Sequence, residues 1–340
     1  VVRCPVSNDK ALLLMVVSII TPLYKVEDFI ARCADSLFRQ SYTEIEYIFV
    51  DDCSSDRSVE VLLQVAERYP QLQQQIRILH HESNRGVAAA RETGLAAATG
   101  EYVYWVDADD WIEPDAIEKM VVRSEQGQKD IIACGWYLCF RQNERRMPMP
   151  CYADAETALR GMLSGTMRWN LWLYMIKRDL YLMNDIHFME GENVGEDMLV
   201  LIKLFSHAKS IGFVKDAFYH YVKQNENSLT RLSPEQQMKR QMRNLQAATD
   251  YLVTHFIGKY EKEINFFKLN AKMPLLISND KNSYRTWTAC FPEANKYIMA
   301  NKRQTLRMRL VQLMAAKRQF WLVELYYQLV FKFVYGILYK

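Results

Sequence analysis

Residues 101–110 read EYVYWVDADD, and residues 45–52 read IEYIFVDD. These two stretches decide the fold, because each is a short run of β-branched and aromatic residues, typical of a buried strand, that ends in carboxylates. Two further runs, Val16 to Ile20 and Ile76 to Leu79, have the same character. The first 110 residues therefore contain four predicted strands.

The segments between these strands have the spacing of helices. Apolar residues recur at helical intervals in Glu27 to Gln40 and Ser58 to Tyr69, and Val87 to Ala98 is rich in alanine. Alternating strands and helices predict an α/β fold with a mostly parallel central sheet flanked by helices. In such a sheet the carboxyl ends of neighbouring strands form the ligand-binding edge. We therefore expect Asp51-Asp52 and Asp107-Ala108-Asp109-Asp110 to lie near that edge.

Carboxylates at such an edge suit a nucleotide diphosphate. One carboxylate can accept a hydrogen bond from a base or ribose, and two carboxylates on a turn can bind one hard divalent cation. The cation can then neutralise the charge that develops on a diphosphate leaving group. Neither a G-x-G-x-x-G nor a P-loop motif occurs, which argues against a dinucleotide oxidoreductase and a P-loop enzyme. A calcium loop starting at Asp107 would need glycine where Ile112 stands.

Five ordered motifs carry a resemblance to a known family. They are VSIITPLY (17–24), FVDDCSSD (49–56), NRG (84–86), AR (90–91) and GEYV (100–103), which leads into DADD (107–110). The match continues through FMEG (188–191), GEDM (195–198), YHY (219–221) and NS (227–228). In this order, over about residues 15 to 231, the chain resembles the inverting family 2 glycosyltransferases of the bacterial polysaccharide type, which have the GT-A fold.

The resemblance implies a role for each matched residue. Pro22, Tyr24 and Asp52 would hold uridine, Gly86 and Arg91 would lie along the nucleotide, Asp107 and Ala108 would lie near the ribose and diphosphate, Asp109 would bind Mn²⁺ or Mg²⁺, and Asp197 would be the general base. A carboxylate within hydrogen-bond reach of an acceptor hydroxyl can remove its proton as it attacks. Three positions depart from the family pattern: Lys25 and Glu92 stand where asparagine is common, and Cys53 stands where glycine is usual.

The same side chains have simpler interpretations. Asp52 and Asp109 could be helix N-caps, and Asp197 could cap the following helix while Glu196 acts as the base. His220 could complete the coordination of the metal, although a histidine between aromatic residues is more often packed. Trp169 and Trp172 could form a platform for an acceptor sugar, although buried packing is the commoner use of tryptophan, and we favour it.

The function that the resemblance implies is transfer of a hexosyl or N-acetylhexosaminyl group in cell-surface polysaccharide synthesis. The donor would be a nucleotide sugar, with UDP favoured over GDP or dTDP, and the acceptor a saccharide or lipid-linked saccharide. Nucleic acid is not an expected partner. The alternative is a catalytically inactive relative that binds a nucleotide sugar, but such a protein would need no base.

Charge divides the chain into two regions. Residues 1–230 hold 24 Lys and Arg against 33 Asp and Glu, whereas residues 231–340 hold 19 against 7. We predict a GT-A catalytic domain over residues 15–231, with a nucleotide-binding half (15–115) and an acceptor half (116–231). A basic helical region follows over residues 232–340. Residues 1–14 fit neither domain and are interpreted as a leader or cloning remnant.

The basic region ends in an aromatic segment, Phe320 to Tyr339, with a narrow polar stripe. We expect a helix that packs on the protein, joins a second copy in a homo-oligomer, or lies in a membrane interface, where residues 295–340 would bind the surface. The central Glu324 and Lys332 argue against a membrane-spanning helix. The seven cysteines lack metal-binding or paired spacing, so we expect reduced, mostly buried thiols in a cytoplasmic protein. If the aromatic segment lies in a membrane interface, the protein would be peripheral at the inner face of the cell membrane.

Overall fold

A computed structural model of the chain describes residues 15–223 and 234–330. The strands are β1 (Val17–Leu23), β2 (Ile45–Asp51), β3 (Ile76–His80), β4 (Tyr102–Trp105), β5 (Trp111–Ile112), β6 (Ile131–Cys139), β7 (Glu144–Met147), β8 (Tyr174–Lys177) and β9 (Ile211–Val222). The helices up to β9 are α1 (Ile30–Phe38), α2 (Ser58–Ala66), α3 (Val87–Ala97), α4 (Ala116–Arg123), α5 (Ala155–Leu163), α6 (Arg178–Leu182) and α7 (Glu196–His207). Beyond it come α8 (Pro234–His255), α9 (Glu261–Lys272), α10 (Lys281–Ala289), α11 (Leu306–Ala316) and α12 (Phe320–Tyr326).

One mixed sheet organises the first 222 residues, with strand order β3-β2-β1-β4-β8-β6-β9-β5 and β7 paired to β6. The first four strands of this order are mutually parallel, as predicted, with Leu23 opposite Asp51 and Ile20 opposite Trp105. Strand β8 runs antiparallel to both of its neighbours. The predicted α/β architecture with flanking helices is therefore confirmed, and the antiparallel strands are an addition that the sequence analysis did not make.

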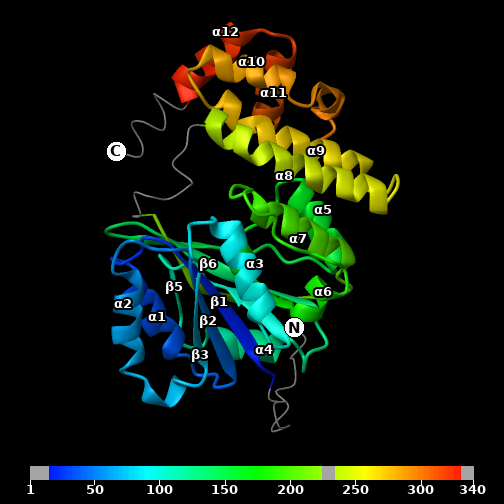
Figure 1. The fold of residues 1–340 in the computed structure, drawn as a ribbon. Helices are drawn as coiled ribbons and strands as arrows, with labels where there is room; N and C mark the ends of the chain where they lie inside the picture. The colour runs from blue at the N-terminus through cyan, green and yellow to red at the C-terminus, as the bar shows by residue number, and fades with distance from the viewer. Residues whose placement is uncertain (1–14, 224–233, 331–340) are drawn as a thin grey trace.

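Buried side chains explain why the strands read as apolar runs. All seven residues of β1 except Pro22 are buried, and β4 is buried throughout. Helix α3 packs on β1 and β2, where Gly94 brings its backbone close to Ile20. Strands with both faces covered lose the polar alternation of a half-exposed sheet. Figure 1 shows α3 crossing one face of this sheet.

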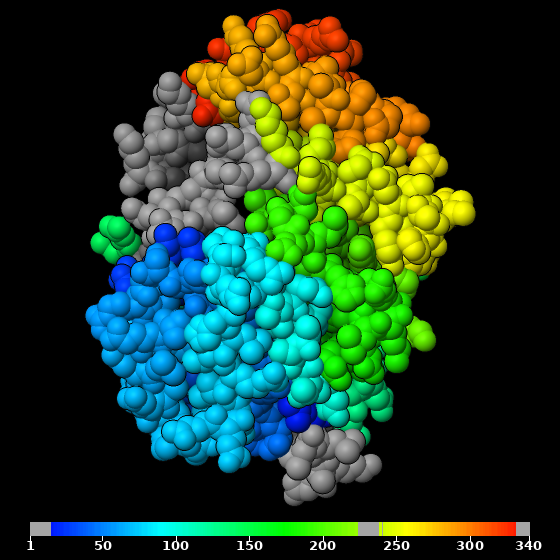
Figure 2. Space-filling view, in the orientation of Figure 1, coloured from blue at the N-terminus to red at the C-terminus, as the bar shows by residue number. Residues whose placement is uncertain are grey.

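The basic C-terminal region is helical, as predicted. Helix α8 packs against α7 and α9 against α5, and Figure 2 shows these yellow helices seated on the green segment. Helix α12 begins at Phe320, and its predicted end at Tyr339 lies outside the described residues, as do residues 1–14. Among the helices of the described residues, none has both the length and the apolarity that crossing a bilayer requires.

The cysteines agree in part with expectation. The six within the described residues are all free thiols, and Cys33, Cys134, Cys139 and Cys290 are buried. Cys53 and Cys151 are exposed.

Candidate active site

The carboxyl ends of β2, β1 and β4 meet at one edge of the sheet. The Asp52 N–H donates to the Leu23 carbonyl at 2.9 Å, and the Val106 N–H donates to the Ile20 carbonyl at 3.1 Å. These ladder bonds extend the strands as far as the predicted donor-binding residues. The edge therefore brings together the Pro22–Tyr24 end of β1, Asp52 and the turn from Asp107 to Asp110. The ring of Tyr24 is 44% exposed there.

The buried carboxylate of Asp52 holds the loop that leads into α3. One oxygen accepts from the Arg85 N–H at 2.8 Å and lies 2.7 Å from Nδ1 of His81. The other accepts from the Gly86 N–H at 2.7 Å. Asp52 does not cap a helix, since α2 begins at Ser58 after Arg57. The loop that carries the Asn84-Arg85-Gly86 motif is thus fixed by the acid at the end of β2.

Gly86 is required where two distant loops touch. Its φ is +89°, and a Cβ built on it would lie 2.2–2.5 Å from the side chain of Asn193. The side-chain oxygen Oδ1 of Asn193 accepts from the Ala88 N–H in the first turn of α3 at 3.1 Å. Nearby, Arg85 makes a two-pronged ion pair with Glu190, with both contacts at 2.9 Å. Residues 190–193 therefore close over the start of α3, a contact that the sequence analysis missed.

Arg91 on α3 joins carboxylates from two parts of the chain. Its guanidinium donates to Asp107 at 3.1 Å, to Glu196 at 2.5 Å and to Asp197. The arginine is 4% exposed, and its Nε has no hydrogen-bond partner among the residues that the structure describes. The sequence analysis placed Arg91 along a nucleotide; in the structure its Nη atoms are bound to these acids. Three carboxylates around one buried cation leave an excess of negative charge.

The turn after β4 holds acids with different environments. Burial, followed by the neighbouring Asp109 and Asp197, raises the pKa of Asp107 to about 6 against the opposing effect of Arg91. Asp109 is partly buried, and Ala108 is buried. Asp110 is buried and accepts from the Tyr219 hydroxyl at 2.6 Å and the Val222 N–H at 2.7 Å. Asp110 thus fixes the turn to β9, whereas the side chains of Asp107 and Asp109 are partly exposed.

The predicted base lies in the first turn of α7. The N-cap of this helix is Gly195 in the left-handed conformation, so Asp197 does not cap it. Besides its bond to Arg91, Asp197 accepts from the Leu171 N–H at 3.2 Å. Glu196 is more buried, and burial together with the neighbouring Asp197 raises its pKa. Of the two candidate bases, Asp197 keeps more of its side chain exposed, 18% against 10%.

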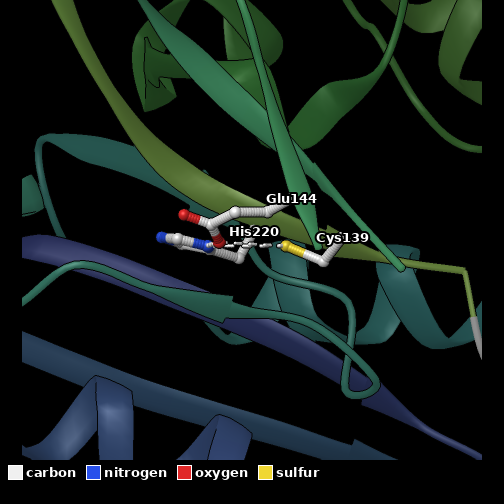
Figure 3. A group of neighbouring side chains, drawn as sticks. All are labelled: Cys139, Glu144 and His220. Carbon is white, nitrogen blue, oxygen red and sulfur yellow. Dashed lines mark hydrogen bonds and ion pairs between the residues drawn. The ribbon is translucent and has the colours of Figure 1, made fainter. Parts of the chain in front are cut away.

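Packing bears on the interpretation of two aromatic side chains. His220 is stacked between Trp111, with ring centroids 3.4 Å apart, and Tyr137, at 4.5 Å. Its Nε2 lies 2.9 Å from Glu113, and its Nδ1 faces Cys139 and Glu144 (Figure 3). Trp172 is buried and stacks on Tyr219 at 4.2 Å, which confirms the packing interpretation for this tryptophan.

Comparison with known proteins adds independent information. Residues 18–205 match the model of glycosyl transferase family 2. The chain is 31% identical over 274 residues to the uncharacterised glycosyltransferase EpsJ of Bacillus subtilis, a match that covers 77% of each chain. The first three curated relatives are matched over 60% to 77% of their own length.

Solved structures share the fold at lower identity. The crystal structure of TarS 1–349 from Staphylococcus aureus in complex with UDP-GlcNAc is 20% identical, with a TM-score of 0.61 and coverage of 92% of both chains. The mannosyltransferase PcManGT from Pyrobaculum calidifontis, in complex with GDP-Man and Mn²⁺, has a TM-score of 0.53 at 19% identity and covers 92% of this chain and 84% of its own.

Proposed function

Since this chain belongs to glycosyl transferase family 2 and is a glycosyltransferase, we propose that it moves a hexosyl or N-acetylhexosaminyl group from a UDP-linked donor to an acceptor hydroxyl, with inversion. The match to the family model confirms the family that the motifs indicate, and the likeness to TarS confirms the predicted GT-A fold. The observation that carries the proposal is the binding of Asp107 and Asp197 to the same arginine, Arg91. A donor edge and a candidate base are thereby held side by side.

The donor half of the proposal rests on the edge formed by β2, β1 and β4. The exposed ring of Tyr24 offers an apolar face to a base, and Asp52 orders the loop from His81 to Gly86 next to it. A role for Asp52 at the base itself stays a prediction. The UDP-GlcNAc complex of TarS, a protein with the same fold, favours a uridine nucleotide as the donor carrier.

The acids after β4 fit a divalent cation. Carboxylate oxygens are the ligands that Mg²⁺ and Mn²⁺ prefer, and Asp107 and Asp109 offer such oxygens two positions apart on one turn. Asp109, with Asp107 beside it, would hold the ion. When bound, such an ion offsets the charge that develops on the diphosphate leaving group. The Mn²⁺ in PcManGT belongs to a protein of the same fold. Whether His220 adds a ligand stays a prediction.

The acceptor half of the proposal rests on Asp197. Its two oxygens are held by Arg91 and the Leu171 N–H, so the carboxylate is fixed in orientation. A fixed carboxylate next to the donor edge can take the proton of an attacking hydroxyl. A single displacement at the anomeric carbon then inverts its configuration. Glu196 is the alternative base, and its burial makes it the less accessible of the two.

Measurement of UDP release tests this function directly. The purified chain is incubated with Mn²⁺ and a panel of UDP-sugars, with and without saccharide acceptors. We expect release with at least one donor, loss of release in Asp109→Ala, and loss of transfer with retained UDP binding in Asp197→Asn. Glu196→Gln is the matched variant for the base. Full transfer by Asp197→Asn would reassign the base, and no turnover of any donor would favour the alternative of an inactive nucleotide-sugar-binding relative.

We further propose that residues 15–231 form the catalytic domain, that residues 232–340 support it, and that the C-terminal end binds a membrane surface bearing the acceptor. Trp321, Leu325 and Leu329 are 66%, 48% and 56% exposed and recur every four residues, the spacing of one helical face. Exposed cations lie in the preceding segment: Lys302, Arg303, Arg307, Lys317 and Arg318. Exposed aromatics beside cations suit an anionic headgroup region.

Flotation with anionic liposomes at low salt tests the membrane proposal. The intact chain should float with the vesicles, and Trp321→Glu should reduce the bound fraction. Leu63→Glu, at an exposed leucine on α2, is the matched control and should have no effect. An intact chain that stays in the soluble fraction would leave a second copy of the chain or another protein as the partner of this face.

A further inference from the structure

Three potential metal ligands from separate strands converge beside the turn that holds Asp110. Cys139 ends β6, Glu144 opposite it begins β7, and His220 lies on β9, the other neighbour of β6. Figure 3 shows their side chains pointing toward one another. Among the described residues, these three form the one group of three or more potential ligands whose donor atoms all lie within 4.8 Å of one another.

The distances within this cluster are those of a tetrahedron around one small ion. His220 Nδ1 lies 3.5 Å from the Cys139 sulfur and 3.3 Å from Oε2 of Glu144, and the sulfur lies 3.7 Å from the same oxygen. Zinc bonds are about 2.3 Å long to sulfur and about 2.0–2.1 Å to nitrogen and oxygen. In a tetrahedral site these bonds place nitrogen and oxygen about 3.4 Å apart, and sulfur about 3.5 Å from each of them. All three observed edges agree within about 0.2 Å, the tolerance of such sites.

The chemistry of the donor atoms favours zinc over the ion proposed at Asp109. A thiolate, an imidazole and a carboxylate together suit Zn²⁺, whereas Mg²⁺ and Mn²⁺ prefer oxygen ligands. The second nitrogen of His220, Nε2, lies 2.9 Å from Glu113. A carboxylate on the far nitrogen is the usual support of a zinc-bound histidine, because it fixes the tautomer and the ring orientation.

The surroundings hold the histidine and leave one side open. Trp111 and Tyr137 stack on the two faces of the His220 ring, with interplanar angles of 12° and 17°. His220 is 2% exposed, while the side chain of Glu144 is 50% exposed. A fourth coordination position on the side of Glu144 would therefore be reached by water. An ion here would join the β6–β7 hairpin to β9 through His220. Trp111, which stacks on His220, belongs to β5, the strand that follows the acidic turn.

From this geometry we infer that Cys139, Glu144 and His220 bind one Zn²⁺ ion, with solvent in the fourth position, at a site separate from the donor-binding metal. Binding displaces the thiol proton of Cys139 to solvent and forms a Zn–S bond. The inference assigns Nδ1 of His220 to this ion rather than to Asp109. It does not depend on the proposed transfer reaction, since it concerns ion binding alone.

Cobalt titration of the metal-stripped full chain tests the inference, because Co²⁺ replaces zinc and shows a charge-transfer band when bound by a thiolate. We expect one equivalent of Co²⁺ to produce this band with the visible spectrum of a tetrahedral site, and one equivalent of Zn²⁺ to abolish it. Cys139→Ser should lose the charge-transfer band. Cys151→Ser, an exposed cysteine outside the cluster, is the matched control and should keep it.

Two further variants separate this site from the donor site. Glu113→Gln should weaken zinc binding about 10- to 100-fold while leaving the thiolate band in place at saturation. Asp109→Ala should keep the band even where it abolishes UDP release. The inference is overturned if the wild-type chain gives no thiolate band, if Cys139→Ser and Cys151→Ser bind zinc equally, or if Asp109→Ala removes the band.

Discussion

Arg91 on α3 and Asp197 on α7 form a direct ion pair although 106 positions separate them in the chain. The same guanidinium binds Asp107 at the end of β4, so one buried cation joins the donor edge to the helix of the candidate base. A buried charge is tolerated only where partners compensate it, and here the compensation comes from the acids themselves. The two halves of the site therefore depend on one side chain for their relative position.

Replacing Arg91 should destabilise the protein strongly. Arg91→Met leaves Asp107, Glu196 and Asp197 close together without their cation, and removing one partner of a buried ion pair costs about 3–5 kcal/mol. Arg85→Met removes an arginine whose ion pair with Glu190 is largely exposed, and it should leave stability nearly unchanged. Urea unfolding followed by circular dichroism compares the two. Equal midpoints for both variants would show that the Arg91 cluster contributes no stability.

Asp107 should make stability depend on pH. Its pKa in the folded protein, about 6, lies above the ordinary value of 3.8, so between pH 4 and pH 6 the folded state binds more protons than the unfolded state. Stability contributed by this group is therefore lost as pH rises through that window. Its side chain is 31% exposed, so solvent screens part of a cost on the order of 1–2 kcal/mol.

Asp107→Asn removes this cost and should unfold at a higher temperature than wild type at pH 7.5, with the difference shrinking toward pH 4.5. Differential scanning calorimetry across this range measures the change. Asp56→Asn serves as the control. Hydrogen bonds from Ser58 and the Glu27 N–H lower the pKa of Asp56 despite its partial burial, so the stability that Asp56 contributes is lost as pH falls, opposite to Asp107. A difference between Asp107→Asn and wild type that does not change with pH would contradict the assignment.

The sequence predicted the parallel core because apolar runs and intervening helices are local signals. The departures at Lys25 and Cys53 have a structural meaning that the sequence alone did not disclose. Both residues adopt a left-handed backbone, with φ of 53° and 58°. Asparagine and glycine are the residues that tolerate this conformation best. The family pattern at these positions therefore follows from backbone geometry, and this chain keeps the geometry with less suitable residues.

Cys53→Gly should stabilise the protein by about 0.5–1 kcal/mol. Glycine removes the left-handed penalty of about 1–2 kcal/mol, and the greater freedom of its unfolded chain offsets part of this gain. Cys53→Ala also removes the thiol but keeps the Cβ. The left-handed backbone penalty therefore remains, and this variant should give no gain in stability. Thermal unfolding of both variants measures the difference. A similar rise in both would point to loss of the exposed thiol rather than to the backbone.

Gly86→Ala should be more harmful than Gly191→Ala although both glycines have positive φ. At Gly191 nothing lies within 4 Å of an added Cβ, so only the left-handed penalty of about 1 kcal/mol applies. At Gly86 the added carbon meets the Asn193 side chain, which must move away from the Ala88 N–H. We expect a further loss of stability and at least about tenfold weaker UDP binding by calorimetry.

Asn193→Gly in the Gly86→Ala background provides the internal check. It removes the side chain that the new methyl group meets, so the double variant should lose less than the sum of the two single losses. Additive losses would show that the two loops do not contact each other in solution.

One contact between the C-terminal helices and the α/β part of the chain could not have been predicted. It is made by Asn244 in the middle of α8, and one asparagine on a helix carries no sign of its distant partners. The buried Asn244 amide donates to the carbonyls of Glu192 and Val194 at 3.3 and 3.0 Å. These carbonyls belong to the loop that leads into α7, four and two residues before the candidate acid Glu196.

Asn244→Ala should therefore lower the rate of sugar transfer, although Asn244 lies on α8 and is not one of the predicted site residues. Two part-buried carbonyls lose their donor, which costs up to about 1–3 kcal/mol, and the loop before Asp197 gains freedom. We expect kcat to fall, because Asp197 follows this loop in the first turn of α7. Gln246→Ala is the control, since Gln246 is exposed and bonds only to Asp250 on its own helix. Unchanged kcat in Asn244→Ala, measured as UDP release with acceptor present, would mean that the C-terminal helices do not position the base.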